Sequence, residues 1–353
     1  MDLYILNTDF EVIGVVDDAS SVIWNSRYWS SGDFEIYIRA NKDIIDLLQP
    51  DYYVTRLDSD EVGMIMNRTI KTNSEDGNYL TVTGDFLDGI LKRRISWNQS
   101  TISGNVEECI RQLIVENIID PVDPARRIDN FVLAEKAGLT ETLKGFDIQS
   151  TGDDLSDVIA NICQTYKIGY KVTLTPENKF LFTLYRGIDR GYGQTENDYV
   201  VFSPEFDNLI SSEYTYNREE YRNAAVVLAE GEGTSQRRVS IGTTTGLNRF
   251  ETRIDGSSVS SNGEIITQAT YDKMLTEYGQ EQLDNLKIKE GISGEVENNV
   301  TYVANEDYFL GDVVSTANEY GFVSDTRVIE MLESEDENGY KILPTFDTWE
   351  VRI

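Results

Sequence analysis

Two distant stretches of this sequence resemble each other, and this internal echo limits the fold more than any other feature. Residues 63–65 (Gly-Met-Ile) and 74–79 (Ser-Glu-Asp-Gly-Asn-Tyr) are matched, in the same order, by residues 321–323 (Gly-Phe-Val) and 334–340 (Ser-Glu-Asp-Glu-Asn-Gly-Tyr). An apolar run that starts at a glycine and ends at an acidic turn before another run is typical of a β-hairpin. The echo predicts a duplicated β-module, with two similar small barrels in one chain; chance likeness between acidic hairpin turns is the alternative.

The sequence around the first copy, residues 1–97, indicates short strands. Phe34, Ile36 and Ile38 alternate with more polar neighbours, which gives one apolar face. Asn41 stands where a short helix needs an N-cap. Strands are expected at 3–6, 12–16, 21–24 and 34–38, and a helix at 41–48.

The middle segment, residues 98–200, has a helical period instead. Apolar residues recur every three or four positions near 105–118 and again from 155 to 166, which predicts two amphipathic helices. Strand-like runs at 169–174 and 179–186 flank a Pro-containing turn, which predicts a hairpin. This segment is therefore expected to be α/β.

Beyond residue 200 the strand pattern returns, with one interruption. Residues 224–229 and 237–241 predict a strand pair across the glycines of 231–233, residues 271–286 have helical spacing, and residues 302–353 alternate as strands again. Taken together, these patterns predict a β-rich α+β fold, and a chain of 353 residues has room for two to three domains.

The composition excludes several functions. The chain has 31 Lys and Arg residues against 62 Asp and Glu, a formal net charge of −31, and no histidine. Such a charge disfavours binding to nucleic acid or to an anionic membrane. Ser-His-Asp, Cys-His and His-ligated metal sites are excluded because they need imidazole. No run approaches the roughly 20 apolar residues of a membrane-spanning helix, and the N-terminus lacks the pattern of a signal peptide.

The sequence gives little support for a phosphate-binding loop or a calcium-binding loop. Residues 191–193 and 231–233 each hold two glycines but lack the third glycine of a dinucleotide loop, so plain turns are the better interpretation. Residues 58–63 open like an acidic calcium loop, but Val62 stands at its fifth position and Thr69 at its twelfth, where a bidentate Glu is needed. A hairpin connection is predicted there.

Catalytic side chains find no better support. Asp153 and Asp154 are adjacent acids, but acids before a helix are explained by the helix dipole. Cys109 and Cys163 lie in apolar helical patterns without a histidine to activate them. We expect two buried thiols in a protein assembled in the cytoplasm, with a disulfide as the alternative. No catalytic, cofactor-binding or metal-ligating residue is assigned, and no cofactor is expected.

Three short basic clusters complete the set of motifs. Residues 92–94, 126–127 and 237–238 are each surrounded by acids. Salt-bridged surface or subunit contacts are the better interpretation than nucleic-acid recognition, which needs a broad basic patch.

Several stretches spread along the chain form a recognisable set. They are residues 24–36 (Trp-Asn-Ser-Arg-Tyr-Trp-Ser-Ser-Gly-Asp-Phe-Glu-Ile), 208–214 with 221–227, and 310–314 with 326–330 and 342–346. In order and spacing this set resembles the siphophage tail hub proteins, also called tail-associated or tail-tip hub proteins. The resemblance extends over nearly the whole chain.

The resemblance implies a fold like the central baseplate hub of contractile-tailed phages, a homotrimer whose subunits each contain two tail-tube-like β-barrels. It divides this chain into a first barrel (1–97 and 201–223), an inserted α/β domain (98–200), a second barrel (224–250 and 297–353) and a smaller helix-containing insertion (251–296). The strand near 209–216 would return to complete the first barrel. Three such subunits would form a pseudo-sixfold ring.

The implied function is structural and non-enzymatic. The ring would lie at the tail tip of the virion, contact the tail tube, tape-measure and distal tail proteins and the receptor-binding or fibre proteins, and gate DNA that passes without being bound. The net charge suggests an acidic channel wall that repels DNA. The alternatives are a cell-wall glycan-cleaving tail component, with two converging carboxylates, and a glycan-binding module built on the many Tyr and Trp side chains.

Overall fold

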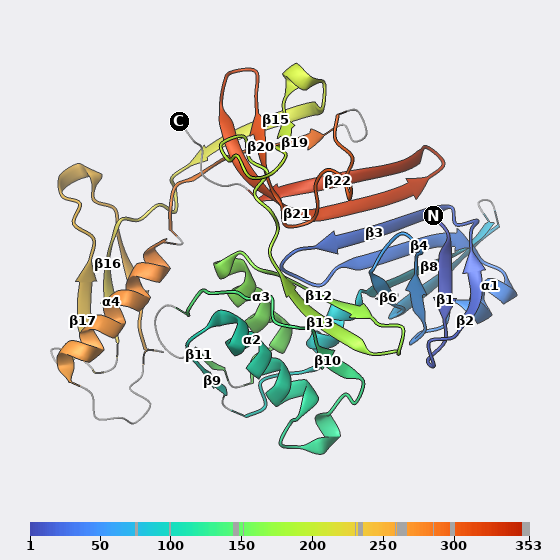
Figure 1. Ribbon diagram of the computed structural model, residues 1–353, viewed down its shortest axis with the longest axis horizontal. Coiled ribbons are helices and arrows are strands. Elements are labelled where there is room, and N and C mark those ends of the chain that lie inside the picture. The colour runs from blue at the N-terminus through green and yellow to red at the C-terminus, as the bar shows by residue number, and fades with distance from the viewer. Residues whose placement is uncertain are drawn as a thin grey trace.

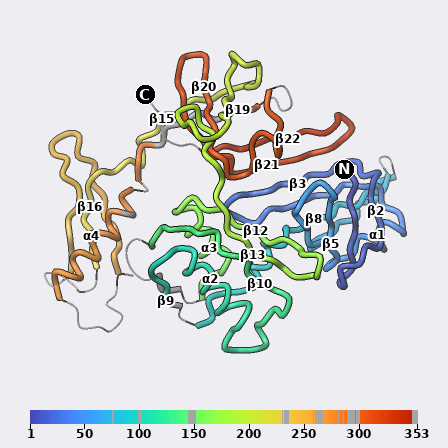
Figure 2. Tube along the Cα trace, viewed as in Figure 1, coloured from blue at the N-terminus to red at the C-terminus, as the bar shows by residue number. Residues whose placement is uncertain are grey.

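A computed structural model describes residues 1–74, 77–98, 100–143, 148–150, 152–229, 231, 236–257, 259, 267–284, 286–296 and 301–347. We distinguish four parts in it (Figure 1): an N-terminal part (residues 1–98), a middle part (100–186), a C-terminal part (187–217 and 286–347) and a side part (218–284). The chain rises from the middle part into the C-terminal part, as the Cα trace shows (Figure 2). The fold is β-rich α+β, as the sequence predicts.

The N-terminal part consists of two four-stranded arrays that enclose one apolar core. Phe34, Ile36 and Ile38 point into this core, as their alternation predicts, together with Trp24 and Leu80. The first array has the order β2-β1-β5-β6 and the second β3-β4-β8-β7. The bounds are β1 (Leu3–Leu6), β2 (Val12–Val16), β3 (Ser21–Arg27), β4 (Asp33–Arg39), β5 (Tyr53–Thr55), β6 (Val62–Met64), β7 (Asn67–Asn73) and β8 (Gly77–Asp85). Helix α1 (Lys42–Leu47) begins at the predicted cap, since the Asn41 side chain accepts a hydrogen bond from the Ile44 N–H at 2.9 Å.

The middle part confirms the predicted α/β pattern. Helices α2 (Val106–Ile114) and α3 (Leu155–Tyr166) bury their apolar stripes against each other and against the hairpin of β12 (Gly169–Leu174) and β13 (Phe180–Tyr185). A π-helical turn (Val115–Ile119) extends α2. The smaller elements are β9 (Ser100–Ile102), β10 (Phe131–Leu133), β11 (Ile148–Ser150) and a 3₁₀ turn (Pro124–Arg126), and a longer 3₁₀ segment (Leu87–Arg93) at the end of the N-terminal part leads towards them.

The C-terminal part continues the N-terminal sheet. Strand β21 pairs antiparallel with β3, from Glu330 opposite Arg27 to Glu335 opposite Val22. This joint makes one eight-stranded sheet from segments about 300 residues apart. The strands are β14 (Val201–Phe202), β20 (Val313–Ala317), β21 (Val323–Asp336) and β22 (Gly339–Asp347). Residues 302–312, predicted as strand, form turns with one isolated bridge, and residues 348–353 lie outside the described residues.

Strand β15 (Leu209–Asn217) corrects one expectation. It pairs with β19 (Lys289–Val296) and with no strand of the N-terminal part among the described residues. Leu209 and Val296 instead share an apolar core with Val314 and Phe346, because apolar side chains at the near ends of the pair fill the space over β20–β22. The division into whole domains stays a prediction.

The side part is a small sheet covered by one helix (Figure 1). β16 (Ala224–Leu228) pairs with β17 (Arg238–Ile241) as predicted, and with β18 (Glu251–Asp255) in parallel. Helix α4 (Gln268–Asp284) lies at the predicted helical spacing and buries Tyr271 and Leu275 against the sheet.

Candidate functional site

The N-terminal, middle and C-terminal parts meet around Tyr28, which has no exposed surface. The tyrosine follows β3, in the stretch that carries the family resemblance. Its hydroxyl donates to the Lys167 carbonyl of the middle part at 3.2 Å and accepts from the Gly187 N–H at 3.3 Å. The Arg327 guanidinium of β21 lies 5.7 Å from the centre of its ring. Tyr28 therefore binds three chain segments together, and burial raises the pKa of its hydroxyl.

Two glycines leave room for this contact. A Cβ on Gly311 would lie 2.3 Å from the Tyr28 ring, and its φ of +95° is a conformation that L residues rarely adopt. A Cβ on Gly187 would lie 1.9 Å from the Gly311 carbonyl oxygen. The Leu-Gly-Asp stretch at 310–312 is thus explained by close packing on the aromatic turn near the N-terminus.

Charged side chains hold the seam between β3 and β21. Glu330 accepts hydrogen bonds from the Asn25 amide at 2.5 Å and from the Arg27 Nε at 3.0 Å. Arg27 also forms an ion pair of 2.9 Å with Asp33. Glu330 thereby ties the outward face of the joint to β3.

Arg56 lies on the other side of the same seam, with only 4% of its surface exposed. Its guanidinium forms two hydrogen bonds to Asp58, at 3.0 and 2.8 Å, and an ion pair of 2.9 Å to the buried Glu333 of β21. The Tyr340 hydroxyl also donates a hydrogen bond to Glu333 at 2.5 Å. Burial opposes the charge on Arg56, but its hydrogen bonds to Asp58 and Glu333 outweigh burial and raise its pKa.

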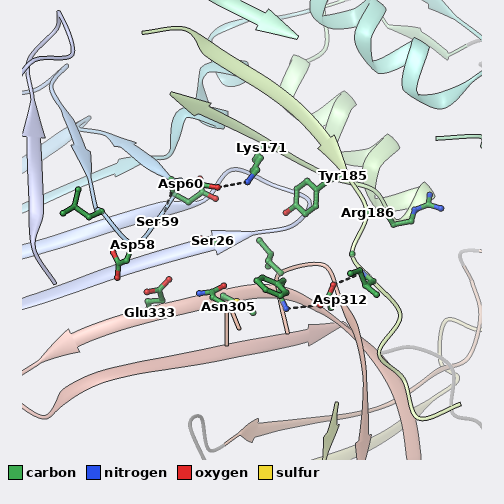
Figure 3. A pocket seen from close by; sticks show the side chains of 17 residues that line it. Ser26, Asp58, Ser59, Asp60, Lys171, Tyr185, Arg186, Asn305, Asp312 and Glu333 are labelled. Atoms are coloured by element: carbon green, nitrogen blue, oxygen red, sulfur yellow. Dashed lines mark hydrogen bonds and ion pairs between the residues drawn. The ribbon is translucent and has the colours of Figure 1, made fainter. Parts of the chain in front are cut away.

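An open cleft of about 650 Å³ lies where these parts meet (Figure 3). Its walls come from the β5–β6 loop, from β12 and β13, and from the turn before β20. Most of its acids are engaged in pairs: Asp60 with Lys171 at 3.3 Å, and Asp312 with Arg190 at 2.8 Å. Asp312 also accepts the Ile188 N–H at 2.7 Å, which positions the chain as it leaves β13.

Two carboxyl groups near the cleft have raised pKa values. Burial raises the pKa of Glu61 to about 8, with the nearby Asp88 carboxyl adding to the shift and Lys171 opposing it. Burial likewise raises the pKa of Asp88 to about 7, although the Ser31 hydroxyl donates to it at 2.9 Å. Asp88 is 4% exposed, so it is a structural group between two parts rather than one that meets solvent.

The cleft offers little for glycan cleavage. That chemistry needs a protonated acid and a second, available carboxylate across the bond. Glu61 fits the first role by its pKa, but Asp58 and Glu333 are bound by Arg56, and Asp60 and Asp312 by Lys171 and Arg190. In the part of the chain that the structure describes, no group of three or more acidic or cysteine side chains could hold a metal ion.

The predicted motifs lie at structural positions. Residues 58–61 lie in the loop between β5 and β6, residues 62 and 63 begin β6, and the two strands pair as a hairpin, so the hairpin interpretation is confirmed. Asp154 caps α3 by accepting the Ser156 N–H at 2.8 Å. Gly191 lies in a turn closed by the Gln194 N–H, whereas Glu232 and Gly233 lie outside the described residues.

The cysteines and the basic clusters also have structural environments. Cys109 and Cys163 are buried thiols that form no disulfide, as expected, and burial raises the pKa of Cys163. In the basic clusters, Lys92 pairs with Asp85 and Arg127 with Asp129, as the salt-bridge interpretation expects. Arg126 instead stacks on Trp97 at 5.4 Å.

Sequence reasoning did not find Arg56, Glu333 or Asp88. Their partners are distant in the sequence, and 62 acids offer far too many candidate pairs. Only Tyr28 could have been singled out, because it lies in the aromatic stretch at 24–36.

Comparison with solved structures defines the class. The 43 kDa tail protein of prophage MuSo2 from Shewanella oneidensis is 11% identical, with a TM-score of 0.59 over 99% of this chain and 98% of that chain. The tail protein from Neisseria meningitidis MC58 is 13% identical, with a TM-score of 0.55 over 98% and 96%. Prophage tail protein gp18 from Listeria monocytogenes EGD-e is 10% identical, with a TM-score of 0.55 over 99% and 96%. The fold is that of prophage tail proteins.

The family is shown by the sequence itself. The model of the Siphovirus ReqiPepy6 Gp37-like protein family matches residues 2–346, so the chain belongs to this family of siphovirus tail proteins. No curated protein matches the chain. Among the described residues, no helix combines the length and apolarity needed to cross a membrane.

Proposed function

We propose that the protein is a non-enzymatic hub at the distal end of a phage or prophage-derived tail, where three copies form a ring. The observation that carries this proposal is the β21·β3 joint, which places both hairpins of the internal echo in one continuous sheet. Two similar units in series are what a threefold ring needs to present six repeats to a sixfold tube. Two tail-tube-like barrels per chain are part of the proposal.

The partners follow from that position. The ring would join the tail tube, tape-measure and distal tail proteins on one side and the receptor-binding or fibre proteins on the other. The engaged acids of the cleft support a structural role over glycan cleavage. Zymography on cell-wall substrate tests this: the expected result is no clearing, and clearing that Glu61→Gln abolishes would establish an enzyme instead.

We also propose that DNA passes along the sheet face that points away from the cores. The alternation of the strands places both acids and bases on this face. The acids include Asp33, Glu35, Asp85, Glu330 and Asp336, and the bases include Arg27, Arg39, Lys71 and Lys341. Several of these side chains are paired with each other, so their charges are largely neutralised and this wall would not bind DNA phosphates. The acidic wall expected from the composition stays a prediction for other channel surfaces.

Mass determination tests the ring. Native mass spectrometry and light scattering of the purified chain are expected to give three copies, and electron microscopy a threefold ring with a central opening. A monomer at every concentration up to the solubility limit, or a closed dimer, would overturn the hub.

A further inference from the structure

Two exposed strand edges have a counterpart elsewhere in the same chain. β7 pairs only with β8, and β15 only with β19, within the described residues. A strand edge presents unpaired N–H and C=O groups to any chain that can add a strand. The strands that occupy the equivalent positions in the other half of the chain indicate what could pair with these two edges.

The counterpart of β7 is β21. Each is the first strand of an echo hairpin, β7·β8 in one copy and β21·β22 in the other. The far edge of β21 is covered by β3, in an antiparallel ladder of six residue pairs. The far edge of β7 pairs with no strand in the part of the chain that the structure describes.

The counterpart of β15 is β3. In the N-terminal part the order is β3-β4-β8-β7. In the C-terminal part β15 pairs with β19, β19 lies against β22, and β22 pairs with β21. The two-stranded sheet β15-β19 thus packs beside β22 and β21, and β21 joins the strands β3-β4-β8-β7 where it pairs with β3. Among the described strands, β15 and β7 each keep one edge unpaired.

We propose that β7 of one copy pairs antiparallel with β15 of a second copy, repeating between chains the β21·β3 joint within the chain. This inference rests on the proposed ring, and it specifies the surface that closes it. β15 and β19 lie at the far end of the C-terminal part from β4 and β8 (Figure 1), so the contact is head-to-tail and repeats until the ring closes.

The exposure of the two strands fits this joint. β7 is exposed at nearly every residue, with Ile70 at 47%, whereas its counterpart β21 alternates between buried and half-buried residues. β15 exposes Ile210 at 56% and Tyr216 at 50%. Apolar side chains of this kind on both edges would be covered when the strands pair.

The charges fit as well. β7 carries Arg68 and Lys71 and no acid, although acids outnumber bases two to one in the chain. The charged residue of β15 is Glu213. The Arg68 guanidinium donates to the Ile45 and Leu48 carbonyls. Lys71 is therefore the exposed cation of β7, and it is complemented by the exposed Glu213 of β15.

Disulfide cross-linking of the full chain tests the pairing. Ile70→Cys in β7 is combined, one at a time, with Cys replacing Ser211, Ser212, Glu213 or Thr215 in β15; the native cysteines are buried and do not compete. Under mild oxidation we expect covalent dimers and trimers, with nothing larger, from those partner positions whose side chains share one sheet face. Matched controls carry Val12→Cys, on the exposed edge strand β2, in place of Ile70→Cys, and these should remain uncross-linked.

The outcomes separate the two proposals. A trimer in solution that no β7–β15 cysteine pair cross-links would overturn this pairing and leave the hub intact. Covalent dimers from Ile70→Cys alone would show β7 against β7 and would also overturn it. A chain that stays monomeric throughout would overturn both the pairing and the ring.

Discussion

The two hairpins of the internal echo differ in how their first strand runs. In the N-terminal part the chain breaks after Met64, so that β6 pairs with β5 in one array and β7 pairs with β8 in the other. In the C-terminal part β21 continues for 14 residues, pairing first with β20 and then with β22, with an irregular register between Val328 and Glu330. Similar sequences thus form two separate strands, β6 and β7, in one copy and a single continuous strand, β21, in the other.

The difference teaches what covers each hairpin. The continuous strand β21 is held between β22 and β3, and its Glu333 is buried with Arg56. The broken copy leaves β7 as an exposed edge. Stability should therefore depend strongly on the seam at β21 and weakly on β7, while association between copies should depend on β7.

The largest effect is expected at the buried ion pair of the seam. Arg56→Met leaves Glu333 buried without its cation and should lower the free energy of unfolding by about 3–5 kcal/mol. The matched control Lys71→Met, on the exposed strand β7, should change it by less than about 0.5 kcal/mol. Urea unfolding at low protein concentration measures both, and equal losses would contradict the contrast between the two strands. Combining Arg56→Met with Glu333→Leu should recover much of the loss.

A smaller effect is expected at Gly84 of β8, which lies close against the end of β6. A Cβ on Gly84 would lie 1.7 Å from the Met64 carbonyl oxygen, which is backbone and cannot rotate away. Gly84→Ala should therefore cost about 1–3 kcal/mol in unfolding free energy. Thr81→Ala, on the same strand but on the face away from the core, is the control. If both variants unfold at the same urea concentration, the close contact between Gly84 and Met64 does not stabilise this hairpin.

The pH dependence should come from the junction rather than from either hairpin. Asp88 has a folded-state pKa of about 7, above the ordinary value of about 3.9. Its buried carboxyl is protonated in the folded chain at pH 5 but must ionise as the pH rises past its folded pKa, so this contribution to stability is present at low pH and lost towards pH 8. Asp88→Asn should reduce the fall in unfolding free energy between pH 5 and 8 by on the order of 1 kcal/mol. An unchanged slope would show that Asp88 does not set it.

Much of the fold was predictable from sequence because its elements are local. The alternation at Phe34–Ile38 and the helical stripe from Leu155 to Tyr166 depend on spacing that burial enforces directly. Pairing between distant strands was not predictable, because β15 pairs with β19 across a segment of more than 70 residues and no local pattern identifies its partner. The junction was hidden for the same reason: Tyr28 and Gly311 are about 280 residues apart, and their fit depends on a missing Cβ.

The smallest effect concerns the open edge itself. Lys71→Glu should leave the stability of the isolated chain within about 0.5 kcal/mol, because β7 has little buried surface. It should weaken association between copies by about 0.2–1 kcal/mol per contact, since an acid would then face Glu213 across the strand pair. Adding Glu213→Lys to the same chain reverses both charges and should restore association, which dilution followed by mass photometry can measure. Recovery in the doubly reversed chain would assign the interface to this pair of edges, because no loss of folding could be repaired by a charge on a strand at the other end of the molecule.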